Sequence, residues 1–495
     1  MRAFVLSRQK FPFITLFIGI FLGLFVVLDP FITNIIVCKI ELTIPILNKN
    51  IFKLYPYEIS SFLFLIIIIS IYIKKLAAYI FLNSEKAFLV LYLIGVQTIA
   101  LTRVGRIDSS EIIVIVFLLL FAVKYMVVHK KVTVTPFDLM NLLFTISVLL
   151  PTFNNGRLFD FLSTVLTVSK LLFIGFLLVT CIENKDNMIF FLKWFVIITG
   201  VSSVIAILQE IAYIVLGIPI VGFVDREALR LMIEPTSFGN FLRVPAFLGS
   251  YKAFTFFANT AALIIFNYFL YKKLLSIKRK SILIISFLLI LISIFLTFSK
   301  DAYLALFIGL VLSVLIWRPY FIFHLFFYGI LSFIIIYLFD YIDDIQSLVY
   351  TELHFGEYRI RLQLFREGVT GFLFNSPWFG VGVGESPRYT GHFYKWPVHN
   401  SLVQAADEVG IVGSSIYFVL LCYTFYNTIK VCFVAKDKSD KWISVGLLTG
   451  FITFITAIQF HPFFPEKFTW LYMGAVQAYV LVTLKRGLGI VKSNA

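Results

Sequence analysis

Arginines, glycines and a histidine follow one another in a fixed order between Glu357 and Gly413, whereas the flanking sequence is long and apolar. The series runs through YRIRLQLFREGV, NSPWFGVGVGESP and VHNSLVQAADEVGIVG. A guanidinium group binds phosphate oxygens in a bidentate manner, and an imidazole can accept a proton near neutral pH. Together these residue types predict a site that binds a diphosphate and moves a proton.

The first of these segments predicts an amphipathic helix near the outer membrane surface. Arg359 and Arg366 share one side of it at helical spacing, and Ile360, Leu362 and Phe365 supply apolar surface. Arginines on such a helix either grip a specific diphosphate or contact the phosphates of lipids. The sequence leaves both possibilities open.

In the second segment, Gly380, Gly382 and Gly384 alternate between Pro377 and Pro387. Glycines at this spacing permit backbone turns and the close approach of a ligand. A phosphate-binding loop, however, requires a strand before the glycines and a helix after them, and the sequence indicates neither. A flexible loop would show the same pattern.

The third segment places His399 at the outer mouth of an expected membrane span. Asn400 and Ser401 follow it and are residue types that cap helices, while Asp407 and Glu408 come about two turns later. A histidine at a membrane interface is either a hydrogen-bonded surface residue or a proton acceptor.

The composition of the whole chain indicates a membrane protein. Of the 495 residues, 60% are hydrophobic and only 14% are charged, which is more apolar surface than one soluble core can bury. The apolar runs are long enough for helices and do not alternate as the strands of a barrel would. They predict an all-α, polytopic membrane helix bundle of about 12–14 spans. The expected spans are 11–28, 58–73, 87–102, 111–128, 138–150, 161–181, 191–217, 252–271, 281–299, 302–317, 320–338, 408–429, 442–460 and 467–484.

The distribution of lysine and arginine predicts that both termini are cytoplasmic. The first span is expected to be retained, because no small-residue cleavage site follows it. We therefore expect a membrane bundle over 1–338 with an outer loop at 218–251, a large periplasmic loop with amphipathic helices over 339–407, and further membrane helices over 408–495.

Charge and cysteine content exclude several other classes of site. The net charge of +15 comes from basic clusters at span ends, which favours contacts with anionic lipids and no nucleic acid. The cysteines show no spacing typical of a disulfide framework or a zinc site. No acidic group has the spacing of metal ligands, so neither a metal nor another cofactor is expected. The cysteines are Cys38, Cys181, Cys422 and Cys432, and the acidic group is Asp340, Asp343 and Asp344.

Taken together, the R-x-R helix, the P-[LW]-F-G-V-G-x-G loop and the H-N-x-L-x-x-x-x-E-x-G-x-x-G segment resemble the O-antigen ligase/polymerase family. The matching residues are Arg359, Arg361, Pro377, Gly380, Gly382, Gly384, His399, Asn400, Leu402, Glu408, Gly410 and Gly413. Members of this family are bacterial inner-membrane glycosyltransferases of GT-C-like fold that take a glycan from undecaprenyl diphosphate on the periplasmic face. About 60 residues match closely.

Two further segments resemble motifs of the same family. LTFSKDAYLAL is similar to its T-x-S-R-x-A pattern, with Lys300 in place of arginine; a pair with Asp301 is the alternative. DREALRLMIEPTSFGNFLR is similar to the form with Glu234 and Pro235 that is common in exopolysaccharide and capsule polymerases. In that segment Arg226 and Arg230 would face one ligand if it is helical, and a solvated charged patch is the alternative.

Two charged residues, Lys170 and Glu210, fall inside expected spans. Such residues are costly in lipid and should face the interior of the bundle. A functional role and a structural contact are equally compatible with the sequence.

The resemblance implies a mechanism and partners. The diphosphate would be bound by Arg226, Arg230, Arg359, Arg361 and Lys300. His399 would take the proton of the acceptor hydroxyl, with Glu234 and Glu408 as alternative bases. The expected partners are an undecaprenyl-diphosphate-linked oligosaccharide, membrane lipids and a chain-length-regulating co-polymerase. A polymerase of repeat units is favoured over a ligase that acts on lipid A–core, and a multispan lipid or glycan transporter is the alternative of another class.

Overall fold

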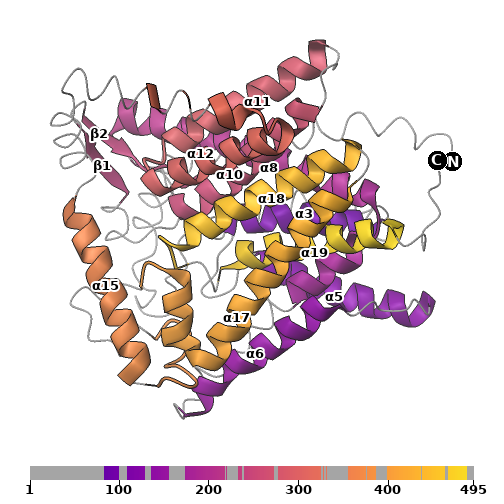
Figure 1. Cartoon of the computed structure of the whole chain (residues 1–495), viewed down its shortest axis with the longest axis vertical. Helices are drawn as coiled ribbons and strands as arrows, with labels where there is room; N and C mark the ends of the chain where they lie inside the picture. Colours follow the sequence, from indigo (N-terminus) through magenta and orange to yellow (C-terminus); the bar gives the residue numbers. More distant parts are fainter. Residues whose placement is uncertain are drawn as a thin grey trace, which may run out of the picture. The chain divides into compact units, whose positions relative to one another are not determined.

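A computed structural model of the chain describes residues 83–99, 109–128, 135–154, 173–217, 219, 232–236, 239–271, 277–324, 327, 330–331, 355–374, 376–385, 398–435, 438–462 and 466–487. The chain divides into two compact units. Unit 1 comprises Met1–Lys130, Asp186–Ala262 and Leu275–Tyr303, and unit 2 comprises Lys131–Lys185, Leu263–Leu274 and Leu304–Ala495. Figure 1 shows that helices make up most of the described chain.

The protein is an all-α polytopic membrane bundle, as predicted. Its elements are α3 (Ser84–Gln97), α5 (Ser109–Val128), α6 (Pro136–Asn154), a helix at 173–181, α8 (Lys185–Leu216), β1 (Ile233–Thr236), β2 (Gly239–Leu242), α10 (Tyr251–Tyr271), α11 (Ile277–Phe295), α12 (Lys300–Trp317), α15 (Phe355–Phe374), α17 (Ser401–Val434), α18 (Lys438–Ile458) and α19 (Lys467–Gly487). Within the described residues, 5 helices are long and apolar enough to cross a membrane, namely α8, α10, α12, α17 and α18.

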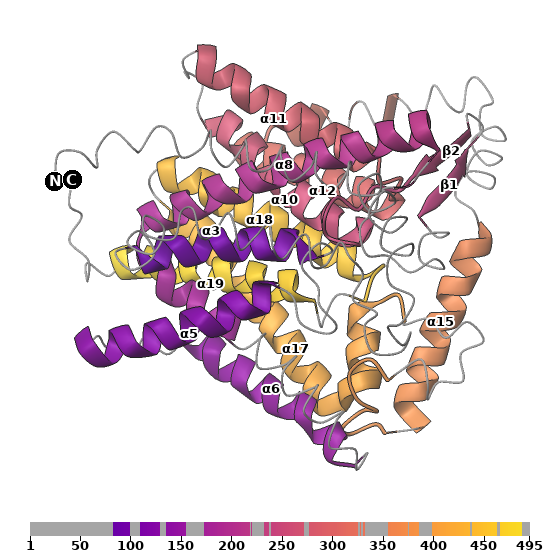
Figure 2. The ribbon, with the colours of Figure 1, turned by 180° about the vertical axis from the view of Figure 1, so that it is seen from behind.

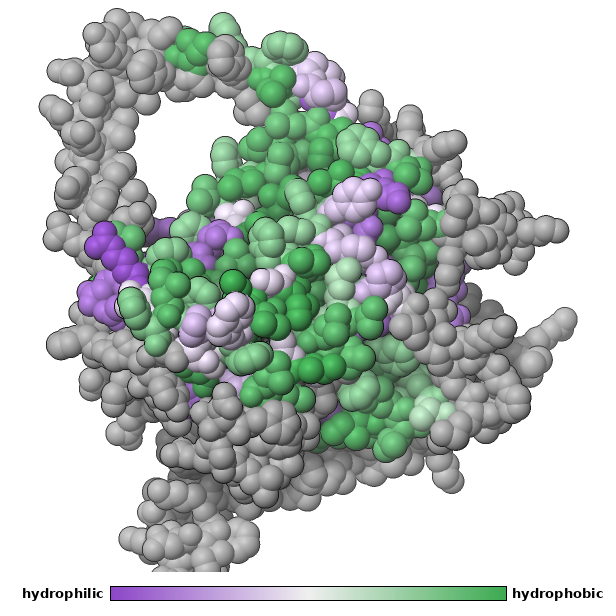
Figure 3. Space-filling view, turned by 60° about the horizontal axis from the view of Figure 1, so that its bottom comes forward, coloured by the Kyte–Doolittle hydropathy of each residue, from purple (hydrophilic) through white to green (hydrophobic). Residues whose placement is uncertain are grey.

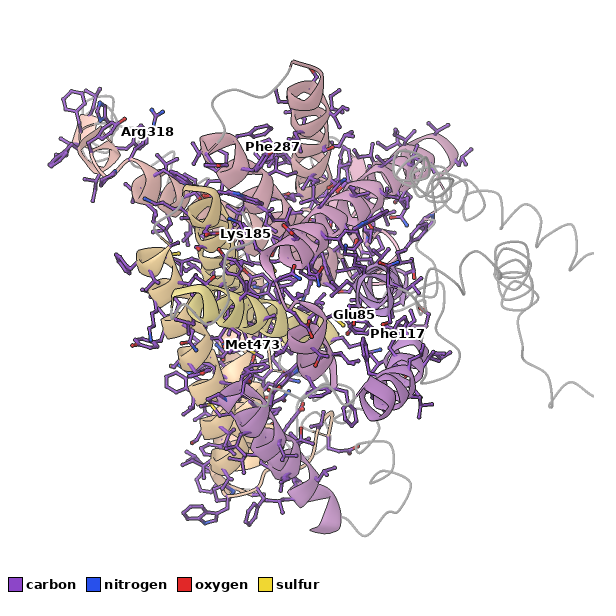
Figure 4. All side chains as sticks on the ribbon, turned by 90° about the vertical axis from the view of Figure 1, so that its right-hand side faces the viewer. Glu85, Phe117, Lys185, Phe287, Arg318 and Met473 are labelled. Carbon is purple, nitrogen blue, oxygen red and sulfur yellow. The ribbon has the colours of Figure 1, made fainter. Side chains whose placement is uncertain are left out.

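Unit 1 is built on α3, α5, α8 and the first part of α10. Phe88 of α3 packs against Phe117 of α5 with ring centroids 5.4 Å apart, and Figure 4 labels Phe117. Gln97 donates to Thr199 Oγ1 over 3.0 Å and accepts from Ser202 Oγ over 2.8 Å. Both ends of this buried amide are satisfied, so the pair α3–α8 is joined at little polar cost.

In unit 2, α19 contributes many buried side chains. One of them is Met473, labelled in Figure 4, which is fully buried. Phe144 of α6 packs against Trp470 of α19 at 5.2 Å and against Tyr417 of α17 at 5.8 Å. The start of α6 is a capping box, because Thr135 and Asp138 exchange hydrogen bonds between side chain and backbone N–H, with proline at the first helical position.

Apolar side chains also cover the outside of the described helices. On α11, for example, Ile282, Ile285, Leu288 and Phe295 are each at least half exposed to solvent. The face drawn in Figure 3 is mainly apolar over its described residues. A surface of this kind fits contact with lipid tails and not with water.

Helices lie where the sequence predicts spans between 87 and 317, and again after 408, as far as these ranges are described. The expected spans 11–28 and 58–73 and most of 161–181 and 320–338 lie outside the described residues. Two differences matter for function. α17 begins at Ser401, before the expected start at 408, and a small antiparallel hairpin forms beside the helices.

The hairpin pairs β1 with β2 so that Glu234 lies opposite Phe241 and Pro235 lies opposite Asn240. A helix was the condition only for Arg226 and Arg230 to face one ligand, and these two residues lie outside the described residues. Proline has no N–H to donate, so it suits a two-stranded hairpin, which has only edge strands.

Candidate functional site

The predicted amphipathic helix is present as α15, and it packs against α17 within unit 2 (Figures 1 and 2). Gly368 of α15 lies close to Val403 of α17 and to the preceding Val398, because an added Cβ would lie 2.5 Å from Val398 Cγ2 and 3.0 Å from Val403 Cγ1. Arg361 is half-buried two turns before Gly368, about 10 Å along the helix and on the same side. Arg366 is exposed on another side. Arg359 belongs to the helix, but its side chain is outside the described set.

His399 is half-buried at the start of α17, between the fully buried Val398 and the capping residue Asn400. Asn400 Oδ1 accepts from the N–H groups of Leu402 and Val403, both over 3.0 Å. This is the N-cap that the sequence predicts, and it sets the direction in which the chain enters the helix.

The turn that follows α18 holds the same end of α17 from another side. Ser401 Oγ donates to the carbonyl of His461 over 2.6 Å, and Asn400 Nδ2 donates to Gln459 Oε1 over 3.2 Å. The backbone next to His399 is therefore anchored by side chains on both following residues.

α17 is not one continuous helix, because Gly410 has φ 66° and ψ −173°. Residues 401–409 form a short first part, called here the short helix, and 411–434 form the long second part. No L-residue adopts this conformation in a helix without strain, so the break depends on glycine.

Residues 376–385, called here the glycine loop, fill the break. In an unbroken helix, Ile411 and Val412 would donate to the carbonyls of Asp407 and Glu408. Here they donate to Pro377 O over 2.8 Å and to Trp378 O over 3.3 Å. The freed carbonyls accept instead from Val381 N–H over 3.1 Å and Gly382 N–H over 2.8 Å. These two N–H groups and these two carbonyls thus find hydrogen-bond partners in the loop.

This insertion explains the alternating glycines. Gly380, Gly382 and Gly384 have φ of 77°, 108° and 76°. A Cβ at Gly380 would lie 2.3 Å from the carbonyl carbon of Glu408, and a Cβ at Gly410 would lie 2.3 Å from Trp378 O. The predicted close approach is thus made to the protein's own backbone, while a Cβ at Gly384 would meet nothing within 4 Å.

Glu408 joins the short helix to the loop. Its side chain is fully buried, one carboxylate oxygen accepts from Gly384 N–H over 2.9 Å, and the other accepts from Gln404 Nε2 over 3.0 Å. Two hydrogen bonds offset part of the cost of burying this polar side chain.

In unit 1, the hairpin is held by a carboxylate in a similar way. Glu210 of α8 is buried and accepts from the N–H of Leu242, over 3.1 Å and 3.3 Å to its two oxygens. Val244 N–H donates to Leu296 O over 3.4 Å, and Phe241 packs on Phe298 at 5.4 Å. The segment that carries Glu234 is therefore tied to the turn that precedes the exposed Lys300, which lies at the predicted helix–helix turn.

Some predicted residues cannot be placed. Arg226, Arg230, Lys170 and the side chain of Glu234 lie outside the described set. Among the residues that are described, no group of His, Cys, Asp and Glu side chains could hold a metal ion, and Cys181, Cys422 and Cys432 form no disulfide.

Arg243, which follows β2, was not among the residues predicted for the site. Its guanidinium donates to the hydroxyl of Tyr251 over 3.0 Å and lies 5.3 Å from the centre of that ring. The available signal was an arginine eight residues before a tyrosine at the start of an apolar run. The break at Gly410 was also missed, although two glycines in EVGIVG stand inside the expected span.

Comparison with known protein families agrees with these features. The model of a family described as O-antigen ligase matches residues 285–418. That range contains α12, α15, the glycine loop, His399 and the break at Gly410. No curated protein matches the chain.

The match confirms the resemblance to the O-antigen ligase/polymerase family, whose members are glycosyltransferase-like enzymes. It supports a function of ligase or polymerase type in a multi-pass membrane protein, with a lipid-linked glycan as substrate and a role in polysaccharide or lipopolysaccharide biosynthesis.

Proposed function

We propose that this protein is a polymerase that joins undecaprenyl-diphosphate-linked oligosaccharide repeat units into O-antigen, capsule or exopolysaccharide. The observation that carries the proposal is the close packing of α15, which bears Arg361, on the anchored segment that bears His399, inside the O-antigen ligase match. The Glu234–Pro235 motif favours a polymerase. The runner-up is a ligase that transfers the glycan to lipid A–core, because the same match fits both.

In the proposed reaction, the oxygen of an acceptor hydroxyl forms a bond to the anomeric carbon of the donor. The bond from that carbon to the diphosphate oxygen breaks, and its electron pair leaves with the undecaprenyl diphosphate. His399 takes the proton of the hydroxyl, and Arg359 and Arg361 stabilise the charge on the departing diphosphate. Arg226, Arg230 and Lys300 remain predicted contacts to the same diphosphate on the basis of the sequence. No metal or other cofactor is part of the proposal.

Burial favours His399 over Glu408 as the base. His399 is only half-buried, whereas Glu408 is fully buried and both of its oxygens already accept hydrogen bonds. A base must reach the proton that it abstracts, directly or through one water. Glu234 stays the alternative base.

We further propose that the protein lies in the bacterial inner membrane with both termini in the cytoplasm and the reaction on the periplasmic face. This placement rests on the lysine and arginine distribution. A chain-length-regulating co-polymerase is the proposed partner beyond the substrate and lipids.

The proposed function is tested with purified full-length protein and an undecaprenyl-diphosphate-linked repeat unit as sole substrate. A polymerase is expected to give a ladder of longer lipid-linked chains on a gel. Product that forms only when lipid A–core is added would identify a ligase. Movement of the substrate across vesicles without bond formation would identify a transporter.

Replacing Arg361 by alanine is expected to lower the rate of transfer about ten- to more than a hundredfold, because a charge-assisted contact of ~1.5–3 kcal/mol is lost. The measurement is the initial rate of ladder formation. Arg318→Ala is the control, because Arg318 is an exposed arginine after α12 that has no place in the proposed diphosphate site, and its rate should stay near that of the unaltered protein. Equal rates for both variants would remove Arg361 from the diphosphate site.

A further inference from the structure

We infer that Glu408 is a positioning residue, which acts by locking the glycine loop into the break of α17 and so holds the short helix that begins next to His399. The inference rests on the proposed function for its effect on turnover, while the locking itself rests on geometry alone. Its first support is that Glu408 stands two residues before the break and its side chain reaches the loop, through the 2.9 Å bond from Gly384 N–H.

Glu408 holds the glycine loop through two hydrogen bonds, one to its backbone and one to its side chain. Its backbone carbonyl accepts from Gly382 N–H over 2.8 Å, and its carboxylate accepts from Gly384 N–H two residues further on. Gly384 has open space beside it and φ 76°, so its own packing restrains it little. The carboxylate therefore supplies a restraint that packing does not.

Gln404, one turn earlier on the short helix, fixes the carboxylate. Gln404 is 4% exposed, and its Nε2 donates to Glu408 over 3.0 Å. Its other side-chain atom, Oε1, is buried and has no hydrogen-bond partner among the described residues. Three of the four terminal side-chain atoms of Gln404 and Glu408 therefore form hydrogen bonds, and these bonds connect the short helix to the loop.

The short helix is held at its other end as well, where Ser401 and Asn400 bond to the turn at 459–461. With both ends held, and with Gly368 of α15 packed at Val398 and Val403, its first residue has a fixed position. Loss of the side-chain bonds of Glu408 would leave this end held by the backbone hydrogen bonds alone and let the His399 segment shift. A misplacement of about 1 Å can cost on the order of 10²-fold in rate.

The arrangement makes the role of Glu408 separable from that of a base. In Glu408→Gln, the amide oxygen can still accept from Gly384 N–H, and the amide NH₂ can donate to the unused Oε1 of Gln404 after that side chain turns. A glutamine keeps the lock but cannot take a proton. In Glu408→Ala, both side-chain bonds are lost.

The test measures two quantities on full-length protein in lipid nanodiscs, with the unaltered protein, Glu408→Ala and Glu408→Gln in parallel. Hydrogen exchange of peptides from 376–385 and 398–412 reports the lock directly, and peptides from α18 report whether each variant is folded. The rate of lipid-linked product formation reports kcat and KM.

We expect Glu408→Ala to speed exchange in the glycine loop at least about tenfold and to lower kcat about 10- to 100-fold, with KM within about threefold. Glu408→Gln should stay within about threefold of the unaltered protein in both quantities, because its hydrogen bonds can be kept. If Glu408→Ala does not fold, Gln404→Ala takes its place. This variant removes the hydrogen bond from Gln404 Nε2 to Glu408.

Activity that follows loop protection across the variants supports the inference. Two outcomes overturn it: slow exchange in Glu408→Gln with activity as low as in Glu408→Ala, which would make Glu408 an acid or base, or unchanged exchange in Glu408→Ala. Failure of the unaltered protein to form product would refute the proposed function, whereas the exchange data would still decide whether Glu408 locks the loop.

Discussion

Replacing His399 by alanine is expected to lower the rate of glycosyl transfer about 10²- to 10⁴-fold, which is the usual contribution of a general base. The acceptor hydroxyl would then have to lose its proton to water. The expected change is in kcat, because the proposed role of the imidazole begins only as the bond to the anomeric carbon forms. The initial rate of ladder formation with the lipid-linked repeat unit checks this expectation.

His324→Ala is a suitable control for this variant. His324 is an exposed histidine of unit 2 and belongs to a short helical turn after α12, so its removal should leave the rate unchanged. Normal turnover in His399→Ala would end the proposed role of the imidazole and move the base to a carboxylate, first to Glu234. Normal hydrogen exchange at 398–403 in this variant would show that the position of the short helix is not what changed.

Replacing Gly410 or Gly380 by alanine is expected to prevent the native arrangement of α17 and the glycine loop. The added Cβ would lie 2.3 Å from backbone atoms, Trp378 O for Gly410 and the carbonyl carbon of Glu408 for Gly380. Positive φ alone costs an L-residue about 1–2 kcal/mol. Backbone atoms on both sides cannot turn away as a side chain would, so the total cost should reach several kcal/mol. Each variant should show a lower thermal unfolding midpoint in detergent and no measurable product.

Alanine substitutions at two other glycines separate the steric contribution to this cost from the conformational one. Gly384→Ala meets open space but keeps φ 76°, so it should lose only the conformational term of about 1–2 kcal/mol. Gly200→Ala, in the middle of α8, meets nothing within 4 Å and should be neutral or stabilising by up to about 1 kcal/mol. If Gly410→Ala behaved like Gly200→Ala, the break in α17 would not be needed for the fold.

Buried carboxylates have a common role beside the hairpin and in the glycine loop. Glu210 accepts from Leu242 N–H next to the hairpin in unit 1, and Glu408 accepts from Gly384 N–H in the glycine loop of unit 2. In each case an acid on a membrane helix holds the backbone of a loop that carries predicted site residues. Sequence analysis treated Glu210 as either functional or structural, and its contact to Leu242 N–H is structural.

The sequence by itself determined the fold class and the order of the elements, because both depend on local composition. Long apolar runs require helices in a membrane, and therefore the predicted spans between 87 and 317 and after 408 coincide with helices as far as these ranges are described, with α17 beginning seven residues before its expected start. The amphipathic helix at α15 and the cap at Asn400 were predictable for the same reason, since they depend on neighbouring residues. So was the resemblance to the O-antigen ligase/polymerase family, which the match at 285–418 confirms.

Only the tertiary structure decided what the glycines of the loop and Glu408 contact. Gly380 and Glu408 are far apart in the sequence, and no local pattern states that the loop of one enters the helix of the other. A glycine can serve to turn a flexible loop, to make room for a ligand or to make room for another backbone segment. These three cases look alike in sequence, because glycine has no side chain whose type would indicate what it contacts. The close approach of Gly380 to Glu408 and of Gly410 to Trp378 distinguishes them, and it exists only once the loop has been inserted into the broken helix.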